Sequence, residues 1–168
     1  MNRNSILNLT DTELLKLCSV SSYKGSGNGG QHRNKTMTGV RLCIAGIEIK
    51  ACDDRSAHIN KLSALKKLRL KIALQIREKP SAKIPFLFPS ANGHISQDNK
   101  LYPQFIADIL DRITDSKATK ATDFLTETAK IWGISKSALN KIITADKRVL
   151  QSIKETSKNS LCNTIPQI

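Results

Sequence analysis

The sequence is poor in aromatic residues and has no long apolar run, and both absences narrow its function. Phe, Trp and Tyr make up 4% of the 168 residues. A protein that binds single-stranded nucleic acid by base stacking needs several exposed rings, so this composition argues against that binding mode. Nowhere do about 18 apolar residues follow one another, which is the length that indicates a membrane-spanning helix. We therefore expect a soluble, cytoplasmic protein that does not associate with membranes.

The cysteines are few and widely spaced. No pair of them has the short spacing of a metal site, and the three histidines do not complete a ligand cluster. We therefore expect no metal and no other cofactor, and we expect buried, reduced thiols. A nucleophilic pair made of Cys43 or Cys52 with His58 is an alternative, but no orienting third partner is evident for it.

Acidic residues are scarce relative to basic ones. The chain has 14 Asp and Glu residues against 27 Lys and Arg residues, a net charge of +13, and a pI of about 9.8. This excess predicts attraction to polyanions such as RNA. It is concentrated in residues 1–100, which contain 17 basic and 7 acidic residues, whereas residues 101–168 contain 10 and 7. The N-terminal part is therefore the one expected to face nucleic acid.

Glycine is concentrated in the segment KGSGNGGQHRNK, which begins at Lys24. Gly29 and Gly30 have no Cβ, so the main chain there can adopt positive φ and approach a ligand closely. Gln31 follows at once with a side chain that both donates and accepts hydrogen bonds. The pattern favours chemistry that uses the main chain at a crowded site.

Short helices and strands are predicted around this segment. Thr10 is placed to cap a helix, and Glu13 is placed to complete a capping box with it. Turn residues separate three short strand candidates, at Cys18–Tyr23, Val40–Cys43 and Ile47–Ala51. Only a short turn containing Ala45 and Gly46 separates the last two, so we expect a hairpin.

A long helix is predicted after Asp53 and Asp54, which we interpret as capping residues rather than as a catalytic acid and base. Apolar residues recur at helical spacing, at Ile59, Leu62, Leu65, Ile72 and Ile76. Most basic residues of the helix lie off this stripe. A lysine-rich face is often plain solvated surface, but beside a glycine-rich loop it favours RNA contact.

The C-terminal part is predicted to be a small helical bundle. Residues 80–103 hold four prolines and a glycine, which indicates a linker or an extended surface loop. Helices are expected at 102–113, at 124–132 and after the caps Ser135 and Asp146. Gly133 is expected to end the helix that precedes Ser135. The segment around Trp132 superficially resembles a helix-turn-helix, although simple helix packing explains the same pattern.

Residues 17–78 resemble the class I peptide-chain release factors and their shorter relatives that rescue stalled ribosomes. The stretch from Lys24 to Leu42 matches the loop with the family's Gly-Gly-Gln signature, and CDDRSAHINKLSALKKLRLKIAL matches the helix that follows it. The resemblance implies an α+β fold, in which a short mixed or antiparallel sheet packs on one long helix and the glycine-rich loop projects. We predict this domain over 1–79, a linker over 80–103, a helical domain over 104–160 and a disordered tail over 161–168.

The resemblance also implies the site and its chemistry. Gly29, Gly30 and Gln31 would be catalytic. The main-chain N–H of Gln31 would stabilise the oxyanion that forms when water attacks the peptidyl-tRNA ester. The amide of Gln31 would be a methylation site for a glutamine methyltransferase. The residues expected to support the loop are Ser26, Gly27, Asn28, His32 and Asn34. The residues expected to contact RNA are Lys24, Arg33, Lys35, Arg41, Arg55, Lys61, Lys66 and Lys67.

The predicted function is ribosome-dependent release of the nascent peptide by a monomeric protein that reads no stop codon, since a codon-reading factor needs further domains. The known small rescue factors have a strongly basic tail, whereas residues 149–168 contain two lysines and one glutamate. We therefore expect either that the C-terminal helices dock on the ribosome or a partner, or that the substrate is a split large subunit. The alternatives are a non-catalytic ribosomal RNA-binding module and a DNA-binding regulator that uses the C-terminal helices.

Overall fold

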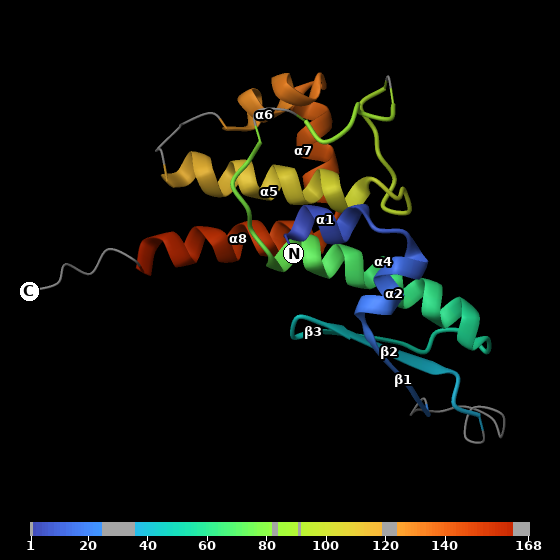
Figure 1. Cartoon of the computed structure of the whole chain (residues 1–168). Helices are drawn as coiled ribbons and strands as arrows, with labels where there is room; N and C mark the ends of the chain where they lie inside the picture. The colour runs from blue at the N-terminus through green and yellow to red at the C-terminus, as the bar shows by residue number, and fades with distance from the viewer. Residues whose placement is uncertain (1, 25–35, 82–83, 91, 119–123, 163–168) are drawn as a thin grey trace, which may run out of the picture. The chain divides into compact units, whose positions relative to one another are not determined.

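The computed structural model describes residues 2–24, 36–81, 84–90, 92–118 and 124–162. Its contacts divide the chain into two compact units, Met1–Ile72 and Ala73–Ile168. The first unit contains a sheet and the second is helical, so the expected α+β fold with a C-terminal helical region is confirmed (Figure 1).

The sheet of the first unit has three antiparallel strands in sequence order. They are β1 (Ser19–Tyr23), β2 (Gly39–Ile44) and β3 (Ile47–Ala51). The register places Val20 opposite Leu42, and Leu42 opposite Ile49. Because side chains alternate between the two faces of a sheet, these three residues share one face. The three predicted strands are therefore confirmed, and β2 extends one residue further at each end.

The β2–β3 hairpin is closed by Ala45 and Gly46, as the sequence predicts. Their φ angles are 47° and 78°. Positive φ at both central positions is the requirement of the type I′ turn, one of the two turn types whose twist matches that of the flanking strands in a two-residue hairpin. Gly46 meets this requirement without steric cost, and Ala45 adopts the same left-handed region despite its Cβ.

Helix α4 (Ala57–Gln75) lies along one face of the sheet (Figure 1). Its inward side chains Ala64, Leu65 and Leu68 are at most 1% exposed, as is Leu42 of the sheet. The predicted apolar stripe is wrong at its first two positions, because Ile59 is 49% exposed and Leu62 is 40% exposed. Residues four apart lie on the same face of a helix, so the inward face that contains Leu68 and Ala64 also contains position 60, where the residue is polar.

Two short helices precede the sheet, α1 (Arg3–Asn8) and α2 (Asp11–Leu17). The predicted capping box of α2 is confirmed: the Glu13 N–H donates to Thr10 Oγ1 at 3.3 Å, and the Thr10 N–H donates to Glu13 Oε2 at 2.8 Å. The hydrogen bonds from Thr10 lower the pKa of Glu13 below its ordinary value. The box therefore stabilises the helix start when Glu13 is ionised.

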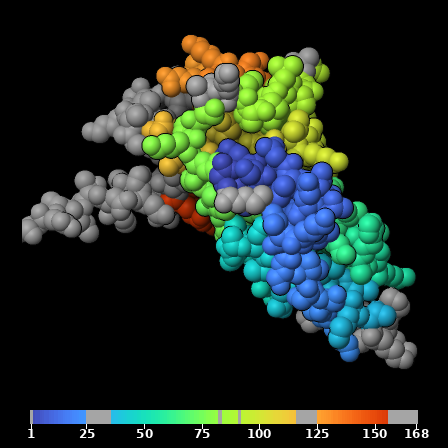
Figure 2. Space-filling model, viewed as in Figure 1, coloured from blue at the N-terminus to red at the C-terminus, as the bar shows by residue number. Residues whose placement is uncertain are grey.

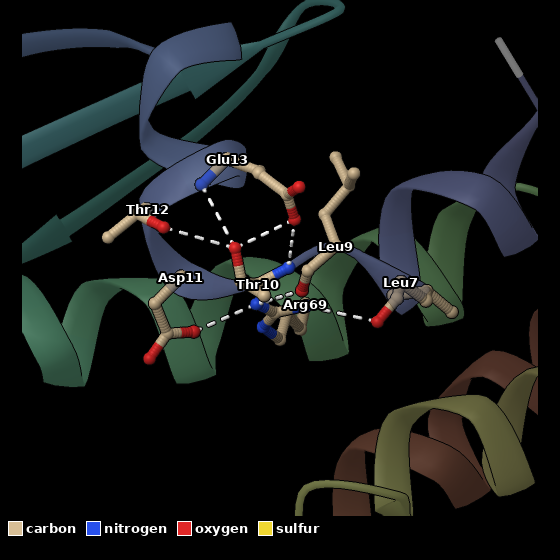
Figure 3. A network of polar contacts seen from close by, with 7 residues as sticks. All are labelled: Leu7, Leu9, Thr10, Asp11, Thr12, Glu13 and Arg69. Atoms are coloured by element: carbon tan, nitrogen blue, oxygen red, sulfur yellow. Dashed lines mark hydrogen bonds and ion pairs between the residues drawn. The ribbon is translucent and has the colours of Figure 1, made fainter.

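Arg69 of α4 ties these helices to the rest of the unit (Figure 3). Its guanidinium donates to the main-chain oxygens of Leu7 at 3.0 Å and Leu9 at 2.8 Å, and it forms an ion pair with Asp11 at 2.8 Å. The last carbonyls of a helix have no partner within it, so a side chain of α4 here supplies a donor at the end of α1. In the space-filling view, atoms of later residues of the unit are visible on both sides of the blue N-terminal segment (Figure 2).

The second unit contains four helices within its described residues. They are α5 (Tyr102–Ala118), α6 (Phe124–Trp132), α7 (Lys136–Ala145) and α8 (Lys147–Cys162), so the predicted helices are confirmed. Gly133 ends α6 with a φ of 62°, and the hydroxyl of Ser135 accepts from the N–H of Ala138 at the start of α7. No helix that the structure describes is both long and apolar enough to cross a membrane.

Two half-buried aromatic rings of the segment predicted to be a linker pack against buried rings of the helices. Phe86 lies 5.1 Å from Trp132 between ring centroids, and Phe88 lies 5.3 Å from Phe105. Phe105 in turn meets Trp132 edge to face at 4.9 Å. Aromatic pairs at these separations stabilise a core beyond their buried area. Part of the 80–103 segment therefore packs on the helices, while the predicted domain boundaries stay a prediction.

Two buried carboxylates organise the helices of the second unit. Asp108 accepts from Trp132 Nε1 at 2.8 Å and pairs with Arg112 at 2.7 Å. Asp146, which is 3% exposed, accepts from the N–H of Arg148 at the start of α8, as predicted for a cap. It also pairs with the Arg148 guanidinium at 2.9 Å and accepts from the Tyr102 hydroxyl at 3.2 Å. Buried charges of this kind need such partners.

Asp146 is expected to make the stability of the second unit depend on pH. Burial raises its pKa, but the hydrogen bonds and charge of Arg148 and the bond from Tyr102 outweigh burial and leave the pKa below its ordinary value. A lowered pKa stabilises the fold above the unfolded value of about 3.9, and this stabilisation is lost as the pH falls through the folded value. Thermal unfolding should therefore separate wild type from Asp146→Asn clearly at pH 6, and the difference should narrow as the pH falls below about 4.

The exposed Glu127 supplies a matched control, because Glu127→Gln removes one charge from the surface of the same unit. Its unfolding midpoint is expected to follow that of wild type across the range. A gap between wild type and Asp146→Asn that stays constant from pH 7 to pH 3 would contradict the assignment.

Candidate functional site

The residues predicted to be catalytic, Gly29, Gly30 and Gln31, lie outside the described residues. The same holds for the other predicted site residues between 25 and 35, namely Ser26, Gly27, Asn28, His32, Arg33, Asn34 and Lys35. What the structure describes is the stem from which this segment departs. The stem consists of Tyr23 and Lys24 on one side and Thr36 to Gly39 on the other.

The stem belongs to a pair of neighbouring antiparallel strands. The last pair in the register of β1 and β2 is Tyr23 with Gly39. Residues 24–38 therefore connect the two strands at one end of the sheet. Both ends of the connection start from a hydrogen-bonded strand pair, which fixes their separation and direction.

Tyr23 and Gly39 are in close contact. A Cβ placed on Gly39 would lie 2.8 Å from Cε1 and Cζ of the Tyr23 ring and 2.8 Å from the Tyr23 main-chain oxygen. The ring therefore occupies the space that a side chain at position 39 would fill, and glycine is the residue that permits this approach. Burial raises the pKa of the Tyr23 phenol, and nearby Cys52 and Asp53 raise it further, so the ring stays neutral.

Asn60 is the polar residue on the inward face of α4, and it joins the stem to the helix. Its side chain is fully buried. Nδ2 donates to the main-chain oxygens of Thr38 and Asp54, each at 2.8 Å, and Oδ1 accepts from the N–H of Asp54 at 2.9 Å. Sequence reasoning missed this residue, although an asparagine in register with Ala64 and Leu68 on an apolar face is the signal that could have found it.

The turn before α4 uses its polar residues to start the helix. Asp54 Oδ1 accepts from the N–H of Ser56 at 2.7 Å, and Ser56 Oγ accepts from the N–H of Ile59 at 3.4 Å. The Ser56 main-chain oxygen accepts the first helical bond, from Asn60. The cap position is therefore Ser56, two residues after the predicted one, and Asp53 instead forms an ion pair with Lys67.

The basic residues predicted to contact RNA fall into two groups within the described chain. Arg41 lies 3.7 Å from Glu48, and Lys67 pairs with Asp53, so their charges are partly neutralised within the fold. Lys24, Arg55 and Lys61 have no ion-pair partner among the described residues, and the side chain of Lys66 is exposed. The two lysines 61 and 66 lie about 140° apart around α4 and so do not share one face.

The cysteines of the first unit are half-buried rather than buried as predicted. Cys18, Cys43 and Cys52 are free thiols of intermediate exposure. Burial raises the pKa of Cys18, and the neighbouring Cys43 adds to the increase. A raised pKa leaves this thiol protonated and weakly nucleophilic at neutral pH.

Comparison with known proteins points to one family. The RF-1 domain family matches residues 12–97, a range that contains the sheet, α4 and the stem. The chain is 50% identical over 52 residues to peptide chain release factor 2 of Helicobacter pylori (strain Shi470) and, equally, to that of Helicobacter acinonychis (strain Sheeba). This match covers 30% of the chain and 14% of each relative.

A second kind of relative is peptide chain release factor 1 of Leptothrix cholodnii, which is 39% identical over 66 residues, or 38% of the chain and 18% of the relative. The chain thus spans less than a fifth of the length of the curated relatives it matches. No solved structure is significantly similar to it.

The close contact in the stem leads to a stability prediction. Gly39→Ala should lower the free energy of unfolding by about 1–3 kcal/mol, because the added methyl meets main-chain as well as ring atoms of Tyr23. Urea titration measures this change. Ser19→Ala, at an exposed position of β1, is the control and should shift the value by less than about 0.5 kcal/mol. Equal stability of Gly39→Ala and wild type would show that the stem yields to accommodate the methyl.

Proposed function

Because the chain belongs to the RF-1 domain family of class I peptide-chain release factors, we propose that it hydrolyses peptidyl-tRNA on the ribosome, in the cytoplasm. The observation that carries the proposal is the family match over residues 12–97, which includes the Gly-Gly-Gln sequence and the sheet and helix around it. The relatives it matches are named as release factors.

The proposed reaction is attack of water on the ester between the nascent peptide and the terminal ribose of tRNA. The water oxygen bonds to the ester carbon, the bond to the ribose oxygen breaks, and that oxygen leaves with a proton. The Gln31 N–H stabilises the oxyanion of the tetrahedral intermediate, and Gly29 and Gly30 allow the main chain to approach. The Gln31 amide positions the water and excludes larger nucleophiles.

RNA contacts hold the protein in place in this proposal. Lys24 belongs to the stem, whereas Arg55 and Lys61 are next in sequence to Asp54 and Asn60, and Asn60 bonds to Thr38 of the stem. None of the three has an ion-pair partner among the described residues. Lysine and arginine near a phosphate release condensed counterions, so binding weakens as the salt concentration rises. Arg33 and Lys35 add charge beside the catalytic tripeptide.

We further propose that release requires no stop codon and that the protein acts as a monomer in ribosome rescue. In this proposal the helices of 102–162 dock on the ribosome or on a partner.

The Gln31 amide is proposed to carry a methyl group added by a glutamine methyltransferase, which the mass of the native peptide would reveal. A stalled complex on a truncated mRNA, a complex with a stop codon and an isolated large subunit distinguish the substrates.

Gln31→Ala is the direct test of the chemistry. The rate constant of peptide release should fall by about 100-fold or more, because the positioned water is lost, while ribosome binding should change little. Release of labelled peptide from stalled complexes measures the first, and co-sedimentation measures the second. Gln75→Ala removes an exposed glutamine side chain from the end of α4 and should release peptide like wild type.

The variant and the choice of ribosomal substrate each test a different part of the proposal. Full activity of Gln31→Ala would refute the proposed mechanism, and release only in the presence of a stop codon would refute codon-independent action. Binding without release in every ribosomal state would instead favour the non-catalytic RNA-binding module.

The basic residues make a separate prediction about salt. The double variant Arg55→Ala, Lys61→Ala should weaken ribosome binding and reduce the slope of log affinity against log salt by about 0.7–0.9 for each phosphate that the variant no longer neutralises. Lys67→Ala is the matched control, because Asp53 already neutralises Lys67 and its removal should change the slope less. Equal slopes for all three proteins would place the RNA contacts elsewhere.

A further inference from the structure

Asn60 is a polar side chain whose burial at this position costs free energy. It is fully buried on the face of α4 that otherwise contributes Ala64, Leu65 and Leu68 to the core. Burying an amide costs free energy, because the amide loses its hydrogen bonds to water. An apolar side chain of similar size would fill the same space without that cost. Its presence therefore calls for a reason beyond filling the core.

The hydrogen bonds of Asn60 suggest that reason. Both N–H groups of its amide donate to main-chain oxygens, and its oxygen accepts from a main-chain N–H. These partners fix the orientation of the amide, because the reversed amide would set its oxygen against two carbonyls. Asn60 thus satisfies polar main-chain groups that the sheet and the helix leave unpaired.

The three bonds connect two places that are far apart in the chain. Thr38 lies 22 residues before Asn60 and immediately precedes β2, whereas Asp54 lies six residues before Asn60 in the turn that starts α4. The Tyr23 and Gly39 pair is the last in the strand register, so Thr38 lies outside the β1–β2 ladder. Asn60 therefore holds the stem to the start of α4 at the point where the β1–β2 pairing ends.

We propose that Asn60 is a positioning residue for peptide release, which acts by fixing Thr38, and through it the stem of the Gly-Gly-Gln segment, against the start of α4. The inference deepens the proposed function and depends on it. A reacting group displaced by about 1 Å can lose about 100-fold in rate, so the direction of the stem matters to chemistry at its far end. Asn60 touches neither substrate nor reacting atoms in this role.

The test compares Asn60→Ala with Leu68→Ala, a variant that removes side-chain volume from the same buried face, two turns further along α4. Leu68 is fully buried and has an apolar side chain that forms no hydrogen bond to the stem. Release is measured in single turnover, at protein concentrations from below to above saturation, on the complexes that wild type acts on. Asn60→Ala should lower the saturating rate constant by about tenfold to 100-fold, with a half-saturating concentration within about twofold of wild type.

The ratio of the products from two competing nucleophiles is a second measurement, and loss of folded protein alone would not change it. Hydroxylamine can attack the same ester in place of water, which yields a peptidyl hydroxamate instead of the free acid. Loss of folded protein lowers both products alike, whereas a displaced loop discriminates less by size. We expect the ratio of hydroxamate to acid to rise by about tenfold in Asn60→Ala and to stay at the wild-type value in Leu68→Ala.

Each outcome decides the proposal. If Asn60→Ala does not fold, Asn60→Ser, which keeps one hydroxyl donor, is measured against the same criteria. A wild-type rate and product ratio in the Asn60 variant, or equal changes in Leu68→Ala, would reduce Asn60 to a core residue. An inactive wild type would refute the proposed function and the role of Asn60 in it, whereas an active wild type with an unaffected Asn60 variant would refute the role of Asn60 alone.

Discussion

Every polar main-chain group that is buried must find a partner, and the first unit depends on how α4 supplies these partners from its side chains. Asn60 satisfies Thr38 and Asp54 near the start of the helix, and Arg69 satisfies Leu7 and Leu9 further along it. The helix therefore does more than cover a sheet with apolar side chains. It fixes, at two separate points, segments of the chain that have no complete hydrogen-bonding pattern of their own.

This arrangement explains how a small three-stranded sheet holds the stem in a fixed position. Three short strands have few ladder hydrogen bonds, and a sheet of this size needs a helix packed on its apolar face to be stable. Leu42 and Leu65 provide that packing. Packing of apolar side chains is not directional, however, whereas the Asn60 bonds and the contact of Tyr23 with Gly39 hold particular atoms in particular places. The apolar core thus supplies stability, and the polar contacts of the stem supply geometry.

The sequence predicted most of the elements because their signals are local. The capping box at Thr10, the turn at Ala45 and Gly46 and the end of α6 at Gly133 each depend on residues a few positions apart, and each is confirmed. The predicted face of α4 was wrong at Ile59 and Leu62 because periodicity counted apolar residues only. Asn60 is polar, and its inward position depends on Thr38, which lies far away in sequence and offers no local signal. The ion pair of Lys67 with Asp53 was missed for the same reason, since residues 14 apart come together only through the turn before α4.

The charges of the first unit follow the same division between groups that maintain the fold and groups available to a partner. Lys67 and Arg41 meet carboxylates of their own chain, and Arg69 is committed to α1 and α2. An ion pair within the fold weakens the field that an approaching polyanion experiences, so the net charge of +13 overstates the attraction available at any one place. The contribution of a basic residue to RNA binding therefore depends on its partners in the fold and not on its abundance in the sequence. Arg55 follows Asp54 and Lys61 follows Asn60 in the chain, and neither has an ion-pair partner among the described residues, so their charges are not reduced by a carboxylate of the fold.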